Sequence, residues 1–263
     1  MAPGGSTPGV IVRLDTVDST QSVAFALAER GAADRTVVVA DRQLAGRGRR
    51  GRAWSAPAGT SLLVSIVVRP RLPLALVPTL SLATAVAAAE ALRRAASVEA
   101  RLKWPNDLLV SSRKIAGILL ESRMVGRAAA AGSAQPGSDT VTIVGVGINL
   151  GQREFPPDFA DSATSVALET GQAPSREVVL TALLEEFDAW RGRLETEGFK
   201  PIQERWRRFS DTLGRRVTID GVTGIATDLD TDGALLIDVG GSVTRVVAGT
   251  VSSSDGAGAP IPR

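Results

Sequence analysis

Three residue types are absent from this 263-residue chain, which has no cysteine, no histidine and no tyrosine. Without cysteine there is no disulfide framework, no thiol nucleophile and no cysteine-based zinc site. Without histidine, a Ser-His-Asp triad, a histidine general base and an HExxH zinc site are all excluded. Any catalysis must therefore use carboxylate, amine, guanidinium, hydroxyl or amide groups, or a bound metal. The lack of cysteine also fits a reducing cytoplasm, where we expect the protein to act.

Lysine is scarce as well. The chain has 30 Lys plus Arg residues, of which three are lysines, which leaves 27 arginines. The formal net charge is only +2, so a broad surface for a polyanion is not expected and any basic function must be local. Two of the lysines, Lys103 and Lys114, lie in one segment, which indicates a local use for compact ammonium groups. The first ten residues lack the basic and apolar parts of a targeting segment, and we expect no membrane partner.

The order of elements predicts an α+β fold, with a mixed or antiparallel sheet, helices and a small C-terminal β barrel. Strands are expected at 10–17, 36–43, 61–70 and 140–150, with two more flanking a turn at 111–113, and helices at 19–30, 78–98, 175–197 and 201–213. Two segments, 125–139 and 151–173, are expected to be loops. The predicted domains are a disordered tail at 1–9, a catalytic domain at 10–213, a small β domain at 214–252 and a disordered tail at 253–263.

The run GRGRRGR, from Gly46 to Arg52, places four arginines between two expected strands. It matches G-x-G-x-x-G, but no helix and no suitably spaced acidic residue follow, so a dinucleotide fold is not supported. A solvated loop is the plain alternative. We favour an anion site, because clustered guanidinium groups repel one another until an anion enters, and glycine allows close backbone approach. Trp54 then offers a flat face for a purine, or is an ordinary core tryptophan.

A nucleic-acid-binding role is the alternative of a different class, because Arg-Gly tracts bind single strands. Such proteins usually combine a broad basic surface with interleaved aromatic residues. Here aromatic residues make up 4% of the chain and the net charge is near zero, which disfavours that interpretation.

A second informative segment runs from Lys103 through Trp104-Pro105-Asn106-Asp107 to Lys114. Pro105 favours an extended Trp104, and we expect Asn106 and Asp107 at an exposed bend. Asp107 is either a metal ligand or a turn residue. If Lys103 and Lys114 lie on paired strands, their ammonium groups converge. Gly117, inside an apolar strand, marks close approach by a ligand or another backbone.

Together these segments resemble the biotin protein ligase family. The resemblance rests on DST at 18–20, QLAGRGRRGRAW at 43–54, KWPNDLLV at 103–110, KIAGIL at 114–119, GVGINL at 145–150 and ATSV at 163–166. It covers roughly residues 10 to 250. It implies a class II synthetase-like catalytic domain with an SH3-like C-terminal barrel. It also implies the short form of the family, without the N-terminal DNA-binding domain and with no DNA partner.

The resemblance assigns roles only where letters match. Biotin contacts are implied for Ser19, Thr20, Gln43, Arg47, Arg49, Lys114, Gly117, Leu119 and Gly147. ATP contacts are implied for Arg49, Arg50, Arg52, Trp54, Lys103, Asn106, Asp107 and Asn149, with Asp107 as the Mg²⁺ ligand. The residues implied at the reacting centre are Lys114, Arg47, Arg49 and Lys103. Two departures from the family pattern, Gln21 and the run GINLGQ, bear on detailed contacts.

The implied activity is ATP-dependent biotinylation in two steps. Biotin is activated to biotinyl-5'-AMP with release of pyrophosphate, and is then transferred to a lysine of a biotin carboxyl carrier domain, as in acetyl-CoA carboxylase. The substrates are ATP and biotin, with Mg²⁺, and the protein is expected to be a monomer or homodimer. A related ligase that uses lipoate is the nearest alternative.

Overall fold

The computed structural model describes residues 9–127 and 137–253. The chain divides into two compact units, and each is described by itself. The first unit comprises the described parts of Met1–Arg71 and Leu119–Ile148. The second comprises Leu72–Ile118 and the described part of Asn149–Arg263. Seven strands are hydrogen-bonded in the order β1-β2-β3-β7-β6-β5-β4, and a separate five-stranded sheet has the order β11-β10-β9-β8-β12.

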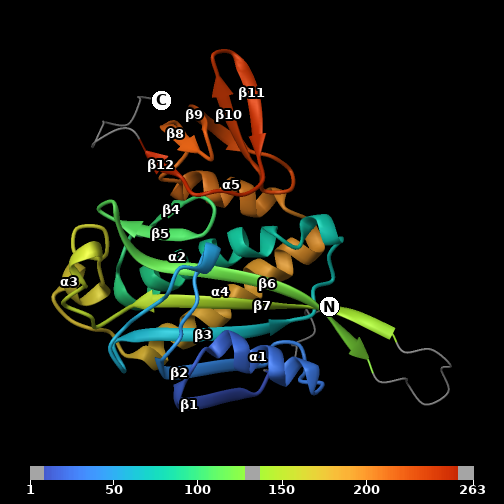
Figure 1. Cartoon of the computed structure of the whole chain (residues 1–263), viewed down its shortest axis with the longest axis vertical. Coiled ribbons are helices and arrows are strands. Elements are labelled where there is room, and N and C mark those ends of the chain that lie inside the picture. The colour runs from blue at the N-terminus through green and yellow to red at the C-terminus, as the bar shows by residue number, and fades with distance from the viewer. Residues whose placement is uncertain (1–8, 128–136, 254–263) are drawn as a thin grey trace. The chain divides into compact units, whose positions relative to one another are not determined.

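The first unit contains β1 (Ile11–Val17), α1 (Thr20–Glu29), β2 (Val37–Gln43) and β3 (Ser61–Val68). It also contains most of β7 (Gly137–Asn149) and the later part of β6 (Arg113–Arg127). β1 pairs with β2 in parallel and β2 pairs with β3 antiparallel, so the sheet is mixed as expected. The helix α1 lies against β2 and β3 (Figure 1).

The core of the first unit forms where α1 meets the sheet. Ala24, Phe25 and Ala28 are buried and pack with Val38, Val67, Val141 and Ile143 of the strands. Their spacing in the helix is that of a single apolar face, which is what buries α1 against the sheet. Because α1 begins immediately after Ser19, this packing fixes the position of the predicted polar residues at its first turn.

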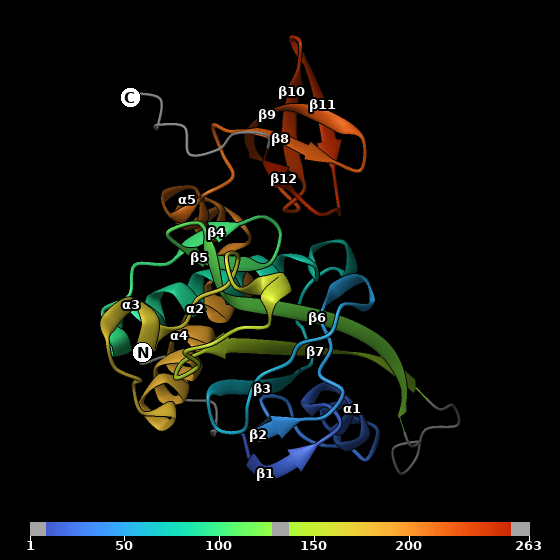
Figure 2. The same cartoon turned by 60° about the vertical axis from the view of Figure 1, so that its left-hand side comes forward.

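The second unit contains a pair of packed helices and the beginning of the strand β6. The helix α2 (Thr79–Ala96) packs along α4 (Arg176–Glu197), and α5 (Lys200–Phe209) contacts both of these helices as well as β4 (Arg101–Lys103) (Figure 2). The strand β5 (Asp107–Val110) pairs antiparallel with β4 and with the beginning of β6. A short helix α3 (Val166–Thr170) follows the 3-10 turn Pro157–Phe159.

The C-terminal part of the second unit is a small antiparallel sheet, as predicted. Its strands are β8 (Arg216–Ile219), β9 (Val222–Leu229), β10 (Leu235–Val239), β11 (Ser242–Val246) and β12 (Ser252–Ser253). All four pairings in it are antiparallel. Alternating burial along β9 and β10 gives the module an inner apolar face.

Among the described residues, one stretch is long and apolar enough to cross a membrane, namely Leu74–Ala96. Length and composition are weak evidence, because the buried core helix of a soluble protein meets the same criteria. Most of the stretch is buried, and α2 within it packs against α4. The helix therefore has the environment of a core helix.

Several predicted boundaries are wrong. Residues 100–110 form two strands, since a turn at 104–106 separates β4 from β5, where one strand was expected. Residues 125–127 and 137–139 belong to β6 and β7 and not to a loop, while 128–136 lie outside the described residues. The helix predicted at 201–213 ends at Phe209.

Two predicted loops or tails also contain structure. The segment 151–173 contains α3 and a 3-10 turn. Ser252 and Ser253 pair with β8, although the tail was expected to include residue 253. The predicted tails at 1–8 and 254–263 lie outside the described residues. The domain boundary at 213/214 stays a prediction.

Candidate active site

The Arg-Gly run folds into a short hairpin in the first unit. The Trp54 N–H donates to the Gly46 carbonyl at 2.9 Å, and the Gly48 N–H donates to the Arg52 carbonyl at 2.7 Å. A 3-10 turn, Arg49–Gly51, forms the tip, with Arg50 in the left-handed region at a φ of 54°. The hairpin uses its own main-chain groups for closure, so its guanidinium groups project from a defined frame. Arg47, Arg50 and Arg52 are exposed, and Arg49 is half-buried.

Gly46 is required by backbone geometry. A Cβ atom at this position would lie 2.3 Å from the Trp54 carbonyl oxygen and 2.9 Å from Gln43 Nε2. Real Cβ contacts are essentially never this short, so any side chain at position 46 would force the two hairpin strands apart. This glycine therefore serves close approach within the hairpin.

Arg47 is directed by a carboxylate of the same unit. Its guanidinium lies 3.2 Å from the Glu121 carboxylate, on β6. Both side chains are about one third exposed, so the pair is weak and exchangeable. An arginine held by an internal carboxylate is able to donate instead to the carboxylate of a ligand.

The predicted polar residues around the start of α1 are brought together. The Thr20 N–H and hydroxyl both donate to Gln43 Oε1, at 2.8 and 3.0 Å. Ser19 is buried, and its Oγ has no hydrogen-bond partner among the described residues. Buried hydroxyls are nearly always paired, so an unpartnered one beside Thr20 fits a place for a polar ligand group.

The environment of Gln21 was not predicted from the sequence. Gln21 is buried, and its Nε2 donates to the carbonyls of Ile143 (3.2 Å) and Leu119 (3.4 Å). The Ser65 hydroxyl is 3.1 Å from Gln21 Oε1 and 2.8 Å from Thr20 Oγ1. Gln21 thus ties the first turn of α1 to β6 and β7. The departure from the family pattern at this position was the one available signal.

Gly147 and Trp54 are in direct contact. A Cβ at Gly147 would lie 2.7 Å from Trp54 Cε2, so the indole ring packs flat against the bare backbone of β7. Trp54 is half-buried. The ring is therefore packed on one side and partly accessible, and the contact of Trp54 with a purine stays a prediction.

In the second unit, the predicted lysines flank Asp107. Asp107 lies opposite Lys103 of β4 and opposite Gly117 of β6 in the strand register. The Lys114 Nζ lies 2.5 Å from Asp107 Oδ1, with the two side chains 36% and 27% exposed. Lys103 and Lys114 are not on paired strands as the sequence argument supposed, because β5 separates β4 from β6. The carboxylate of Asp107 is what relates the two lysines.

Main-chain bonds hold the surroundings of Lys114. The Lys114 N–H donates to the Ser162 carbonyl at 2.7 Å, and the Thr164 N–H donates to the Lys114 carbonyl at 2.9 Å. Asn149 is buried, and its Nδ2 donates to the Thr164 carbonyl at 3.0 Å. The ATSV segment is thus a brace beside Lys114, and Asn149 fixes that brace.

Asn106 also supports the backbone. Its Nδ2 donates to the Ile118 carbonyl at 2.8 Å, and the Ile118 N–H returns a bond to the Asn106 carbonyl at 2.9 Å. This reciprocal pair holds the 104–106 turn against β6. The amide of Asn106 therefore has a structural task in addition to the predicted ligand contact.

The predicted residues thus fall into two sets. The first unit carries Ser19, Thr20, Gln43, Arg47, Arg49, Arg50, Arg52, Trp54, Leu119 and Gly147. The second carries Lys103, Asn106, Asp107, Lys114, Gly117 and Asn149. Within the described ranges, no group of three or more acidic side chains could hold a metal ion, and Asp107 as a Mg²⁺ ligand stays a prediction.

Comparison with known families defines the class. A model of the Biotin/lipoate A/B protein ligase family matches residues 14–134, and a model of the Biotin protein ligase C terminal domain matches residues 212–253. The mixed sheet with its arginine hairpin and the small C-terminal sheet are therefore those of a ligase of the biotin and lipoate class.

Individual relatives narrow the assignment from this class of ligases to one family. A biotin--[acetyl-CoA-carboxylase] ligase of Paracoccus denitrificans is 38% identical over 233 residues, covering 85% of this chain and 92% of that protein. The bifunctional ligase/repressor BirA of Bacillus subtilis is 33% identical, covering 90% of this chain and 72% of that protein. A biotin protein ligase from Aquifex aeolicus, solved in complex with biotin and ATP, superposes with a TM-score of 0.79 at 30% identity, covering 93% of this chain and 99% of that one. The chain belongs to the biotin protein ligase family.

Proposed function

We propose that this protein is an ATP-dependent biotin protein ligase that modifies a lysine of a biotin carboxyl carrier domain in the cytoplasm. The observation that carries the proposal is the arginine hairpin in the same unit as the Ser19, Thr20 and Gln43 cluster. A ureido ring needs hydrogen-bonding groups of that kind, and an acid needs guanidinium groups. The relative of known structure with biotin and ATP bound supports the same assignment.

In the first step an oxygen of the biotin carboxylate attacks the α-phosphorus of ATP. A new P–O bond forms, the bond to the β-phosphate breaks, and pyrophosphate leaves. Both reactants are anions, so the protein must chiefly supply positioning and positive charge. This requirement explains how a chain without histidine can catalyse the reaction.

The residues take the following roles in the proposal. Arg47 exchanges Glu121 for the biotin carboxylate, and Arg49 holds the acyl phosphate. Lys114 leaves Asp107 to neutralise charge at the reacting oxygens. The nucleotide is bound by Arg50, Arg52, Trp54, Lys103, Asn106 and Asn149, while Gly117, Leu119 and Gly147 line the biotin pocket.

The donor set is compatible with Mg²⁺, because this ion usually uses one or two carboxylates together with substrate phosphates. Asp107 is the residue that would hold it. When bound, Mg²⁺ supplies positive charge to the phosphate oxygens. Asp107 is also the partner of Lys114, so release of the ammonium group frees this carboxylate.

In the second step the amine of the acceptor lysine attacks the carbonyl of biotinyl-5'-AMP. The C–N bond forms, the C–O bond to AMP breaks, and the amine loses a proton. A mixed anhydride is already reactive, so orientation and exclusion of water matter most. The exposed arginine hairpin is the segment we assign to covering the intermediate.

The test is direct labelling of a carrier. A purified biotin carboxyl carrier fragment is incubated with the protein, ATP, Mg²⁺ and biotin, and the product is detected with streptavidin. Labelling should need both ATP and the acceptor lysine, and a carrier with that lysine changed to arginine is the control. Lipoate in place of biotin tests the nearest alternative, since a lipoate ligase would transfer lipoate and leave biotin unused.

A further inference from the structure

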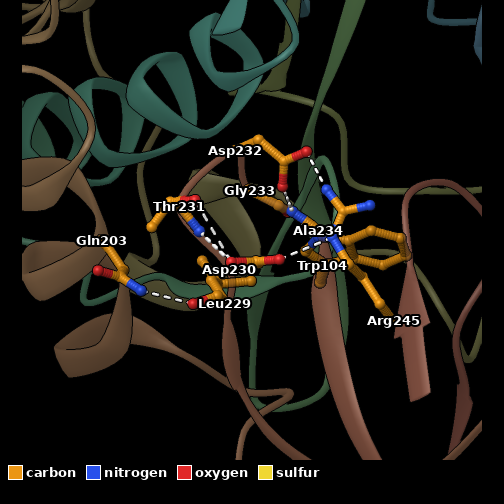
Figure 3. A network of polar contacts seen from close by, with 9 residues as sticks. All are labelled: Trp104, Gln203, Leu229, Asp230, Thr231, Asp232, Gly233, Ala234 and Arg245. Atoms are coloured by element: carbon orange, nitrogen blue, oxygen red, sulfur yellow. Dashed lines mark hydrogen bonds and ion pairs between the residues drawn. The ribbon is translucent and has the colours of Figure 1, made fainter. Parts of the chain in front are cut away.

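The segment Lys103–Asp107 is held from the small C-terminal sheet by the turn between β9 and β10 (Figure 3). Trp104 is buried, and its Nε1–H donates to the Gly233 carbonyl in that turn at 3.1 Å. The Trp104 main-chain N–H donates to Thr212 Oγ1 at 2.9 Å. The residue next to Lys103 therefore has two bonds to parts of the chain more than one hundred positions away.

The turn that receives Trp104 is itself held by side chains (Figure 3). Its Asp230 N–H donates to the Ala234 carbonyl at 2.8 Å. Arg245, on β11, donates through Nε to Asp230 at 2.7 Å and pairs through its second nitrogen with Asp232. Asp232 also accepts the Ala234 N–H at 3.2 Å. One guanidinium thus clamps both carboxylates of the turn. We call Asp230, Asp232 and Arg245 the clasp.

Gly233 is the contact point of the turn. Its φ is +85°, and a Cβ there would lie 2.7 Å from Leu82 Cδ1 and 3.4 Å from Thr79 Cγ2. The turn is therefore seated closely against α2, and a methyl group at this position would require the Leu82 side chain or the turn to move. A displaced turn would carry the Gly233 carbonyl away from Trp104.

These contacts bear on the candidate nucleotide residues directly. Lys103 precedes Trp104, and Asn106 and Asp107 follow it by two and three positions. Asn106 binds β6 and Asp107 pairs with Lys114, so the segment is fixed at one end by β6 and at Trp104 by the Gly233 turn. A small shift in a segment that positions reacting groups is expected to be costly.

We propose that Gly233 and the clasp are positioning elements that set the geometry of the Lys103–Asp107 segment, and so tune use of the nucleotide. The proposal rests on the function given above for its kinetic readout. It assigns a role in positioning to one turn of the C-terminal module, the β9–β10 turn. This turn contacts Trp104 and does not itself touch substrate.

A pair of glycine variants tests the proposal. Gly233→Ala and Gly221→Ala introduce the same methyl group at similar φ values, +85° and +89°, in the same small module. Only the first meets a neighbour, because nothing lies within 4 Å of the Cβ position at Gly221. We expect Gly233→Ala to raise the KM for ATP about tenfold or more, with biotin binding measured without nucleotide unchanged. Gly221→Ala should keep the wild-type KM. Equal KM values in the two variants would overturn the proposal.

A second variant covers the case in which Gly233→Ala folds poorly. Trp104→Phe keeps an aromatic ring and removes only the N–H donor to Gly233. It should raise the KM for ATP in the same direction and leave biotin affinity as it was. A wild-type KM in Trp104→Phe together with faster unfolding would assign the contact to stability alone, against the proposal.

Hydrogen exchange of residues 101–110 provides a readout without activity. Their amides should exchange faster in Gly233→Ala than in Gly221→Ala, and equal exchange would contradict a positioning role. The two failures are distinguishable. If wild-type protein forms no biotinyl-5'-AMP, the proposed function fails, whereas the exchange comparison still decides whether the turn positions this segment.

Discussion

At the scale of single residues, Lys114 combines a bonded main chain with an ion pair at its ammonium group. Its main chain is bonded on both sides by Ser162 and Thr164, and its ammonium rests on Asp107. The main-chain bonds restrain the backbone, while the partly exposed ion pair can exchange its partner. The position of Lys114 is therefore fixed by its main chain, while its ammonium group remains able to bind another anion.

Lys114→Ala should therefore remove adenylate formation while preserving the fold. We expect the rate of biotin-dependent pyrophosphate exchange to fall about a hundredfold or more, because one preorganised charge near the reacting oxygens is lost. The matched control is Lys200→Ala, since Lys200 is exposed at the start of α5. Near-normal exchange in Lys114→Ala would remove this residue from the reacting centre.

Gln21 and Gly145 form a pair that a double variant can separate. A Cβ at Gly145 would lie 2.6 Å from Gln21 Oε1, so Gly145→Ala should lower the free energy of unfolding by about 1–3 kcal/mol through crowding. Gln21→Asn shortens the side chain and disturbs its hydrogen bonds, so the cost of Gly145→Ala should be smaller when it is measured against Gln21→Asn than against the wild type. The measurement is the urea midpoint of each protein.

The control for that pair is Gly192→Ala in α4, where nothing lies within 4 Å of the Cβ position. Alanine favours a helix over glycine, so this variant should gain stability by up to about 1 kcal/mol. An equal cost of Gly145→Ala in the wild-type and Gln21→Asn backgrounds would show that Gln21 is not what crowds the methyl group.

Residue types in the sequence were enough to select the two segments, because clustered arginines and paired lysines are unusual and local. Their partners were not predictable. Nothing in the letters places Glu121 beside Arg47, or Gly233 beside Trp104, since those contacts join residues far apart in the chain. The unusual Gln21 was visible, but its bonds to β6 and β7 depend on the sheet.

At the scale of elements, the arginine hairpin combines exposed cleavage sites with a tip residue in the left-handed region. Arg47, Arg50 and Arg52 are exposed, so trypsin can reach the hairpin when it opens locally. Substrates that bind the guanidinium groups should reduce that opening.

Addition of biotin and ATP should slow tryptic cleavage within 47–52 about tenfold, if the ligands stabilise the closed hairpin by mass action. Cleavage at Arg71, an exposed arginine outside the hairpin, is the internal control and should not change. Peptide mapping by mass spectrometry measures both. Equal cleavage with and without substrates would refute the covering role.

The β9–β10 turn has a predictable response to acid. The Thr231 backbone N–H and then the Arg245 guanidinium hold the pKa of Asp230 below its ordinary value of 3.8. A lowered folded-state pKa means that the ionised carboxylate stabilises the fold at neutral pH, and that this contribution is lost as pH falls through the folded pKa, below 3.8.

Asp230→Asn should accordingly lower the urea midpoint at neutral pH, and the difference from wild type should shrink as the pH falls below 3.8. The side chain of asparagine can still accept the Thr231 N–H, so the variant isolates the charge. Urea titrations at several pH values provide the measurement. A difference that stays constant on acidification would show that the charge of Asp230 is not involved.

Long periodic elements were predicted well and short ones were not. Apolar spacing over 78–98 and 175–197 is long enough to specify helices, and α2 and α4 match it closely. The five-residue α3 and the division of 100–110 into β4 and β5 were missed, because each contains too few residues for a period. Residues 137–139 were predicted to be part of a loop, but they belong to the strand β7. Glycine and serine have a low strand propensity, which the tertiary context overrides here.

At the scale of the whole molecule, the two sets of candidate residues belong to different units, and the proposed function assigns them to two substrates that react with one another. The arginine hairpin is assigned contacts to both substrates. If binding of the first substrate orders this hairpin, the second no longer meets that ordering cost. The two substrates should therefore bind cooperatively.

Calorimetry with biotin and a non-hydrolysable ATP analogue should show mutual strengthening of about 5- to 150-fold, equal in both directions because linkage is reciprocal. Arg49→Gly should reduce this factor more than it reduces binding of either ligand alone. Independent binding, with each affinity unchanged by the other ligand, would contradict an ordering role for the hairpin.

The shortage of lysine has a consequence for the safety of the enzyme itself. Any primary amine that meets an escaped acyl-adenylate can attack its carbonyl and displace AMP, and on this chain only three side chains, all lysines, offer such an amine. The ammonium of Lys114 is paired with the carboxylate of Asp107, whereas Lys200 is exposed at the start of α5. Arginine thus keeps the surface basic without offering an amine to the acyl-adenylate. Acylation of the enzyme's own lysines should therefore concentrate at Lys200.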